Sequence, residues 1–99
     1  MKTEKDLQSY LRRQCKRHTI SFDKVESKSR RGFPDCFLAY EGQVVLVELK
    51  TPAGTGRLSA NQKRVIADLT AHGVVVFIAD SISSVDRIIQ SIVGGDRAQ

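Results

Sequence analysis

GFPDCFLAYEGQVVLVELK, residues 32–50, is the stretch from which the fold of this chain can be worked out. Segments 36–40 and 43–47 are rich in β-branched, aromatic and aliphatic residues, as strands are. Glu41 and Gly42 lie between them and form an X-Gly pair of the kind that closes a two-residue hairpin. We therefore predict a β-hairpin with Glu41 and Gly42 as its turn.

The turn also predicts the register of the hairpin, and that register places two acids side by side. Counting outward from the turn, Asp35 faces Glu48. Opposed residues on one face have Cβ atoms about 4.5–5.5 Å apart, and like charges at about 5 Å repel by roughly 3 kcal/mol at an effective dielectric of 20. Lys50, on the same face as Glu48, is one source of compensating charge, and a divalent cation held by both carboxylates is the other. A surface ion pair on an edge hairpin is the simpler interpretation, and the register alone leaves both open.

Length and composition indicate one small basic domain. The chain has 99 residues, with 16 Lys and Arg against 11 Asp and Glu. We expect residues 1–99 to form a single domain, with 93–99 as a fraying tail. The positive balance favours a polyanionic partner, nucleic acid above all, although a merely soluble basic protein would look similar. The absence of Trp argues against a platform that stacks single-stranded bases.

The cysteines and the hydropathy favour a cytoplasmic protein. Cys15 and Cys36 lack metal-site spacing, and we interpret both as reduced core residues. No apolar run approaches the length of a membrane span, and no signal peptide is evident. We expect no membrane partner and a location in the cytoplasm of a bacterial or phage-infected cell.

Three helices and two further strands are predicted around the hairpin. A first helix begins at the cap Thr3, and a strand containing a core Phe22 spans 20–25. After a loop with proline and glycines at 51–57, Ser59 and Gln62 match a capping box that opens a helix running to His72. Segment 74–79 is a nearly continuous apolar strand, predicted to be buried on both faces and parallel to the second hairpin strand. A last helix is predicted to begin at the cap Ser83. The order is α-β-β-β-α-β-α, an α/β fold with a small mixed sheet flanked by helices.

Basic residues gather in the first third of the chain. Lys28, Arg30 and Arg31 lie in a loop that leads directly into Asp35, as expected where phosphate is handled. Lys24 must reach either solvent or an anion. A solvated surface is the favoured interpretation of the basic face on the first helix, and phosphate contact is the alternative; this face carries Lys5, Arg12, Arg13, Lys16 and Arg17.

Together, these features resemble the PD-(D/E)XK nuclease superfamily, with its restriction-endonuclease-like core, and within it the VRR-NUC (virus-type replication-repair nuclease) family. The resemblance covers the chain from Glu4 to about Ile92. The residues that carry it are Arg31-Gly32-x-Pro34-Asp35, Glu48-x-Lys50, Leu58-Ser59-x-x-Gln62 and Gly73, with Glu4 on the opening helix. The order and spacing of these motifs are more specific than any one of them.

The resemblance implies an enzyme that hydrolyses DNA phosphodiester bonds with Mg²⁺ or Mn²⁺. Asp35 and Glu48 would hold the metal, helped by the main-chain carbonyl of Leu49 and by Glu4. The metal would polarise the scissile phosphate and acidify a bound water.

The same resemblance implies roles for the polar residues around the metal. Lys50 would orient or deprotonate the attacking water, or stabilise charge on phosphorus. Gln62 would position the water or the phosphate. Lys24, Arg30 and Arg31 would hold backbone phosphates, which gives binding that depends on salt but not on sequence.

No base-reading element is evident, so we expect selection by DNA structure, such as a Holliday junction, a flap or another branch. A homodimer would present two active sites, with exposed apolar positions on the last helix or an edge strand as its interface. Two alternatives stay open: a non-catalytic DNA-binding accessory module, and a nuclease that acts on RNA.

Overall fold

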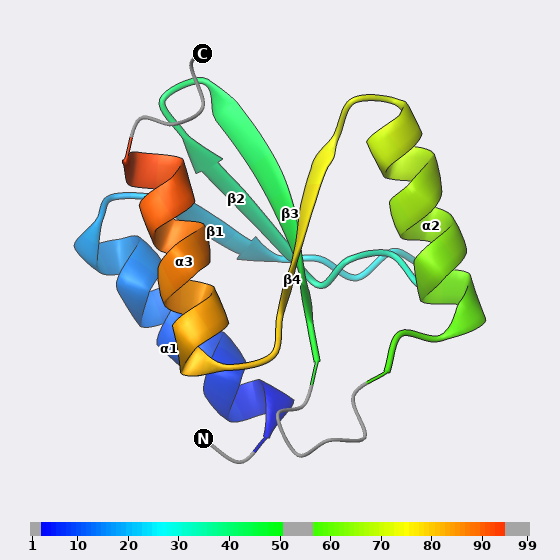
Figure 1. Cartoon of the computed structure of the whole chain (residues 1–99), viewed down its shortest axis with the longest axis horizontal. Coiled ribbons are helices and arrows are strands. Elements are labelled where there is room, and N and C mark those ends of the chain that lie inside the picture. The colour runs from blue at the N-terminus through cyan, green and yellow to red at the C-terminus, as the bar shows by residue number, and fades with distance from the viewer. Residues whose placement is uncertain (1–2, 51–56, 95–99) are drawn as a thin grey trace.

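A mixed sheet of four strands forms the centre of the part of the chain that is described by the computed structural model, residues 3–50 and 57–94 (Figure 1). The strand order is β1-β2-β3-β4, antiparallel except for the parallel pair of β3 and β4. The elements are α1 (Glu4–Arg17), β1 (Ser21–Lys24), β2 (Cys36–Tyr40), β3 (Gln43–Leu49), α2 (Ala60–Ala71), β4 (Val75–Ala79) and α3 (Ile82–Val93). The predicted order of elements is therefore confirmed.

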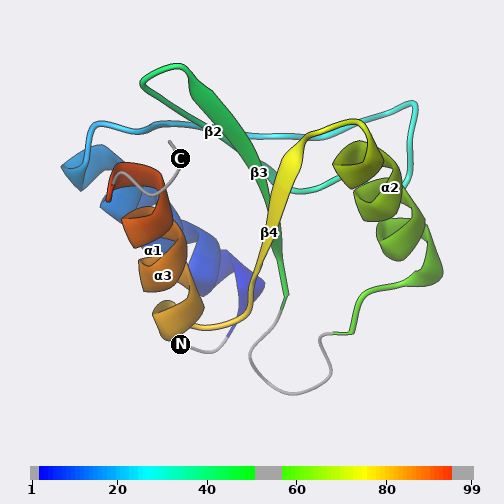
Figure 2. The same ribbon diagram turned by 45° about the horizontal axis from the view of Figure 1, so that its top comes forward.

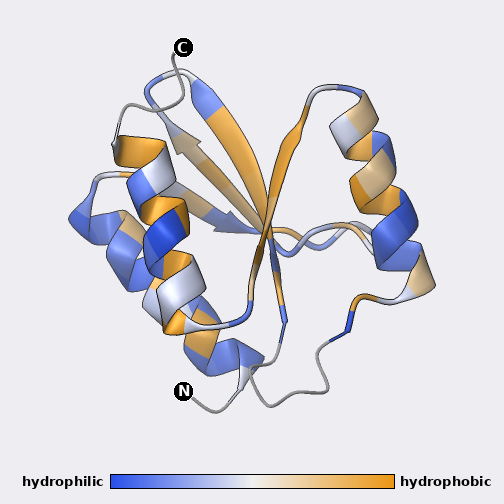
Figure 3. Ribbon diagram, in the orientation of Figure 1, coloured by the Kyte–Doolittle hydropathy of each residue, from blue (hydrophilic) through white to orange (hydrophobic). Residues whose placement is uncertain are grey.

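The helices form layers on the two faces of the sheet. α1 and α3 lie together on one face and α2 lies on the other (Figures 1 and 2). The main core lies between the sheet and the α1/α3 layer, where the orange stripes of the ribbon meet in Figure 3. It includes Leu7 and Leu11 of α1, Val45 and Val47 of β3, and the apolar stripe of α3 at Val85, Ile88, Ile89 and Ile92.

The hairpin turn has the geometry that its sequence predicts. Glu41 and Gly42 have φ angles of +46° and +80°. Positive φ at both central residues is the signature of a type I′ turn, whose twist matches that of the flanking strands. The register follows from it, with Tyr40 opposite Gln43 and Cys36 opposite Val47. The turn thus aligns the whole hairpin.

Local side-chain chemistry also explains where two of the helices begin. Thr3 caps α1 by accepting a hydrogen bond from the backbone N–H of Asp6 at 3.0 Å. Ser59 and Gln62 form the complete capping box of α2. Gly73 follows the C-cap of α2 with a φ of +86°, which glycine adopts without strain.

The predicted start of the last helix was wrong by two residues. Its N-cap is Ser81 and not Ser83, because the Ser81 hydroxyl accepts from the Ser84 N–H at 3.0 Å. The Ser84 hydroxyl lies 3.0 Å from the Ser81 N–H and completes the box. Ser84 is buried, so this cap is enclosed by the fold, whereas sequence spacing alone does not separate it from Ser83.

Strand β4 is not buried on both faces, contrary to the prediction. It lies at the edge of the sheet, and Val75 and Ile78 are 45% and 43% exposed. β1, at the other edge, is shorter than predicted. Phe22 in β1 is only partly buried and packs against the border of the core.

Cys15 and Cys36 are free and buried, as predicted. Burial raises the pKa of their thiols to about 11 and about 12. Within residues 3–50 and 57–94, no helix has the length and apolar character needed to span a membrane. The loop predicted after Lys50 and most of the predicted tail fall on 51–56 and 95–99, outside the described residues, while Val93 is the last residue of α3.

Candidate active site

Asp35 and Glu48 lie on the same face of the sheet, at the end of the hairpin farthest from its turn. The ladder ends at the pair Cys36 and Val47, so Asp35 and Glu48 are the next residues along the two strands. Alternation of side chains turns both toward the α2 face, because Cys36 and Val47 belong to the core on the α1/α3 face. The Leu49 N–H donates to Asp35 Oδ2 at 2.9 Å, which ties the aspartate to β3.

Glu48 is an ionisable residue enclosed by the protein. It is 1% exposed, and its Oε1 is buried without a hydrogen-bond partner among the described residues. The pKa of the Glu48 carboxyl is raised from 4.5 to about 8. Burial is the largest cause, the negative charge of Asp35 is the next and that of Glu4 adds a smaller effect, while the positive charge of Lys50 lowers the pKa. A buried carboxylate with an orphaned oxygen beside a second carboxylate suits a cation.

The amide of Gln62 joins the helix cap to the acids. Its Oε1 accepts from the Ser59 N–H at 2.8 Å and from Lys50 Nζ at 3.2 Å. The amide nitrogen is therefore left to donate to Glu48 Oε2, at 2.7 Å. The capping box thus determines which end of the amide faces the acid and which faces the lysine. Gln62, Glu48 and Lys50 form one connected group.

The close approach of the loop before Asp35 to α2 requires glycine at position 32. Gly32 has a φ of +91°, and a Cβ there would lie 2.8–2.9 Å from backbone atoms of Asn61 and Gln62. Any other residue would push the loop away from the first turn of α2. Gly32 therefore lets the segment that carries Asp35 pack against the helix that carries Gln62.

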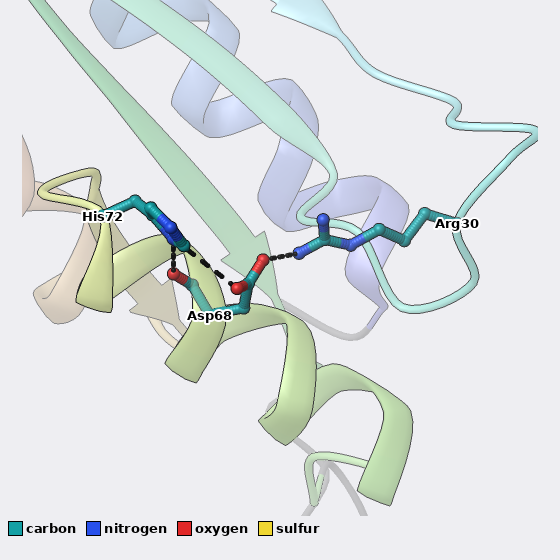
Figure 4. Close-up of polar contacts among 3 residues, drawn as sticks. All are labelled: Arg30, Asp68 and His72. Atoms are coloured by element: carbon teal, nitrogen blue, oxygen red, sulfur yellow. Dashed lines mark hydrogen bonds and ion pairs between the residues drawn. The ribbon is translucent and has the colours of Figure 1, made fainter.

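Arg30 makes a second contact between the same loop and α2 (Figure 4). Its Nη2 donates to Asp68 Oδ2 at 2.7 Å. His72 Nδ1 lies 3.0 Å from the Asp68 carbonyl oxygen and 3.5 Å from Asp68 Oδ1. Arg30 was predicted to hold phosphate, and one of its five N–H donors is occupied by this contact.

The structure brings together only part of the predicted residue set. Asp35, Glu48, Lys50 and Gln62 form the group described above, and Glu4 acts on Glu48 only through its charge. In the described ranges, no three His, Cys, Asp or Glu side chains are close enough to hold a metal ion. Lys24 pairs with Cys36 across the strands, so its side chain lies on the α1 face and not on the carboxylate face.

Sequence reasoning did not foresee the roles of Gly32 and Asp68. Gly32 appeared only as a motif position, and its closeness to Asn61 depends on residues 29 positions apart. Asp68 carries no local signal, since an acid on an exposed helix face is ordinary. The contact of Gln62 with Glu48 had one hint, the position of Gln62 in the first turn of the helix.

Comparison with known proteins identifies the family and the fold of the chain. The chain matches the VRR-NUC domain family over residues 2–82. A solved structure described as a VRR_NUC domain is similar with a TM-score of 0.81 and 23% sequence identity, covering 91% of this chain and 97% of that chain. At that identity the likeness shows a shared fold. No curated protein matches the chain.

Proposed function

Because the chain belongs to the VRR-NUC family, a family of nucleases, we propose that it is a metal-dependent deoxyribonuclease that hydrolyses phosphodiester bonds of structured DNA. We also propose that residues 1–99 act as one nuclease domain in the cytoplasm. The observation that carries the proposal is Glu48, a carboxyl buried beside Asp35 with an oxygen that no donor within residues 3–50 and 57–94 satisfies. A buried carboxylate beside a second, partly exposed carboxylate destabilises the fold unless a proton or a cation neutralises it.

Mg²⁺ or Mn²⁺ is the cofactor that suits these donors. Hard cations bind carboxylate and carbonyl oxygens and need only one or two protein carboxylates. Asp35 and Glu48 would hold the ion, with the main-chain carbonyl of Leu49 as a further ligand. Glu4, which was predicted as another ligand, would contribute only its charge, because it does not form a group of three with the two acids in the described structure. When bound, the ion supplies a Lewis acid for the scissile phosphate and lowers the pKa of a bound water.

Lys50 and Gln62 orient the reacting groups in this proposal. Lys50 Nζ rests on the Gln62 oxygen, on the same face as Glu48, where it can orient or deprotonate water or stabilise charge on phosphorus. Gln62 holds one Glu48 oxygen and leaves the other for the ion. Gln62 also positions the water or the phosphate.

DNA is held through its backbone and selected by shape. Arg30 and Arg31, in the loop that approaches α2, and Lys24 at the end of β1 bind phosphates in this proposal. No helix–turn–helix arrangement is present in the described part of the chain, in line with selection of junctions, flaps or branches over sequences.

A homodimer is the proposed assembly. Edge strand β4 exposes Val75 and Ile78, and Val44 of β3 is 48% exposed. Apolar residues at an open sheet edge are suited to pairing with a second copy. Light scattering at micromolar concentration should give twice the 11.0 kDa chain mass, and a mass of one chain would remove this part of the proposal.

The decisive experiment is nicking of supercoiled plasmid with Mg²⁺ or Mn²⁺ by wild type and by Lys50→Ala. We expect nicking by wild type alone, with DNA binding retained by both. Equal nicking by both would contradict the mechanism, and binding without nicking by wild type would favour an accessory module. Matched RNA and DNA substrates decide between the two nucleic acids.

A further inference from the structure

The excess positive charge of the chain is concentrated in its first third. Ten of the 16 basic residues, but only four of the 11 acidic residues, lie within residues 1–31. This segment forms α1, β1 and the loop that leads toward Asp35. The rest of the chain carries slightly more acids than bases. Six of the ten basic residues lie on α1 and β1, which carry three acidic residues, so a polyanion is attracted to that side of the molecule as well as to the loop.

A basic hollow of about 350 Å³ lies between α1 and β1. Its lining residues are Arg12, Lys16, Ile20, Phe22, Asp23 and Lys24. Arg12 is held over Phe22, with its guanidinium carbon 5.1 Å from the ring centre, and such stacking leaves the N–H donors at the rim available. Neither Arg12 nor Lys16 has an acidic partner among the described residues. Lys24 forms a long ion pair with Glu26, in which Nζ and Oε2 are 3.8 Å apart and both side chains are exposed.

The hollow and the carboxylates lie on opposite faces of the sheet. Lys24 pairs with Cys36, whose side chain is in the core beneath α1, while Asp35 is the next residue along the chain and turns to the α2 face. The Val25 N–H donates to the Asp35 carbonyl at 2.7 Å, so the two sites are neighbours in the backbone. Cations and acids thus face in opposite directions at one corner of the sheet.

Duplex DNA is stiff, and a straight duplex does not follow both faces of one sheet. Bending a short duplex through a large angle costs free energy. A branched DNA already has arms that diverge from one point, so two arms can lie on two faces without that cost. The arrangement of the two sites favours a branched ligand.

We propose that the Arg12/Lys16/Lys24 hollow binds backbone phosphates of a second arm of a branched DNA, while the first arm lies at Asp35 and Glu48. The inference rests on the proposed nuclease function and adds the surface that distinguishes a branch from a linear duplex. Arg12 and Lys16 are one helical turn apart on α1, so both can contact one arm.

The test measures binding, in the non-cleaving Lys50→Ala background, to a four-way junction and to a linear duplex of equal length. The variant is Arg12→Gln with Lys16→Gln, which removes both charges and the guanidinium contact with Phe22 but keeps part of the aliphatic stems. The matched control is Arg13→Gln with Arg17→Gln, which removes the same charge from the same helix at the same spacing but outside the hollow. Thermal unfolding verifies that each variant is folded.

We expect the hollow variant to bind the junction about tenfold more weakly, with its salt slope reduced by about 1.8 for two lost phosphate contacts. Binding of the linear duplex should change by less than about twofold, and the control variant should change neither ligand by more. Equal weakening on junction and duplex would overturn the second-arm assignment, and so would an unchanged junction affinity. Because cleavage is not the readout, loss of the nuclease proposal would appear separately, as wild-type chain that binds a junction without cutting it.

Discussion

Replacing Glu48 with glutamine should make the metal-free protein more stable at neutral pH while it removes activity. The side chain is 1% exposed and its carboxyl pKa is raised from 4.5 to about 8, first by burial and then by Asp35. Glutamine has nearly the same shape and no charge. Its carbonyl can still accept from Gln62, and its amide can donate toward Asp35, so the neighbours stay satisfied.

The sign and size of the effect follow from proton linkage. When folding raises the pKa of an acid, the acid's contribution to stability is fully present below its pKa in the unfolded chain. That contribution is lost as the pH rises through its pKa in the folded protein. Each pKa unit is worth about 1.4 kcal/mol, so by pH 7 wild type loses about 3 kcal/mol relative to pH 4.5. The loss of stability levels off above pH 8. Glu48→Gln does not show this loss, because glutamine has no carboxyl to titrate.

Urea unfolding in EDTA across pH 5–8.5 measures this difference, with Glu26→Gln as the control for an exposed acid. We expect the advantage of Glu48→Gln to grow with pH and that of the control to stay near zero. A variant that is less stable than wild type at pH 8, or an advantage independent of pH, would refute the reasoning that Glu48 is a strained, cation-dependent acid.

Adding Mn²⁺ extends the same experiment. An ion that binds only the folded state stabilises wild type by about 2.7 kcal/mol at a hundred times its Kd. Glu48→Gln lacks one of the two proposed carboxylate ligands and should gain little. Equal stabilisation of both proteins would place the ion elsewhere.

Three further substitutions test the surroundings of the site. Gln62→Glu keeps a good capping residue but exchanges the amide donor to Glu48 for a third carboxylate. Cleavage should fall at least tenfold, and the free energy of unfolding should be lower at pH 8 than at pH 6. Unchanged cleavage kinetics would remove Gln62 from the site. Gly32→Ala should lower the free energy of unfolding by about 1–3 kcal/mol, because its φ is +91° and its Cβ would meet Asn61; a silent substitution in a urea titration would argue against the tight loop–helix contact. Asp68→Asn removes its ion pair with Arg30, in which the Arg30 and Asp68 side chains are 41% and 50% exposed. Chemical unfolding should show a loss of less than about 1 kcal/mol in the free energy of unfolding. A larger loss would mean that this ion pair is a main support of the loop.

The hairpin and the helix caps could be read from sequence because their causes lie within a few residues. A two-residue turn with positive φ determines the opposed pairs of the hairpin, and it leaves Asp35 and Glu48 as the next residues beyond the last pair, Cys36 and Val47. The cap of α2 depends on Ser59 and Gln62, three residues apart. Where two serines offered similar local signals, as at Ser81 and Ser83, local reasoning chose the wrong one.

Sequence alone determined the order of the elements, the register of the hairpin and the two acids at its end, because propensity, turn geometry and alternation act locally. Only the tertiary structure decided the remainder of the site. It packed Gly32 against Asn61, gave the Gln62 amide both Glu48 and Lys50 as partners, and left β4 at a partly exposed edge. It also turned Lys24 to the face opposite Asp35. These results depend on how separate elements pack, and no spacing along the chain encodes the distance between surfaces that meet only after folding.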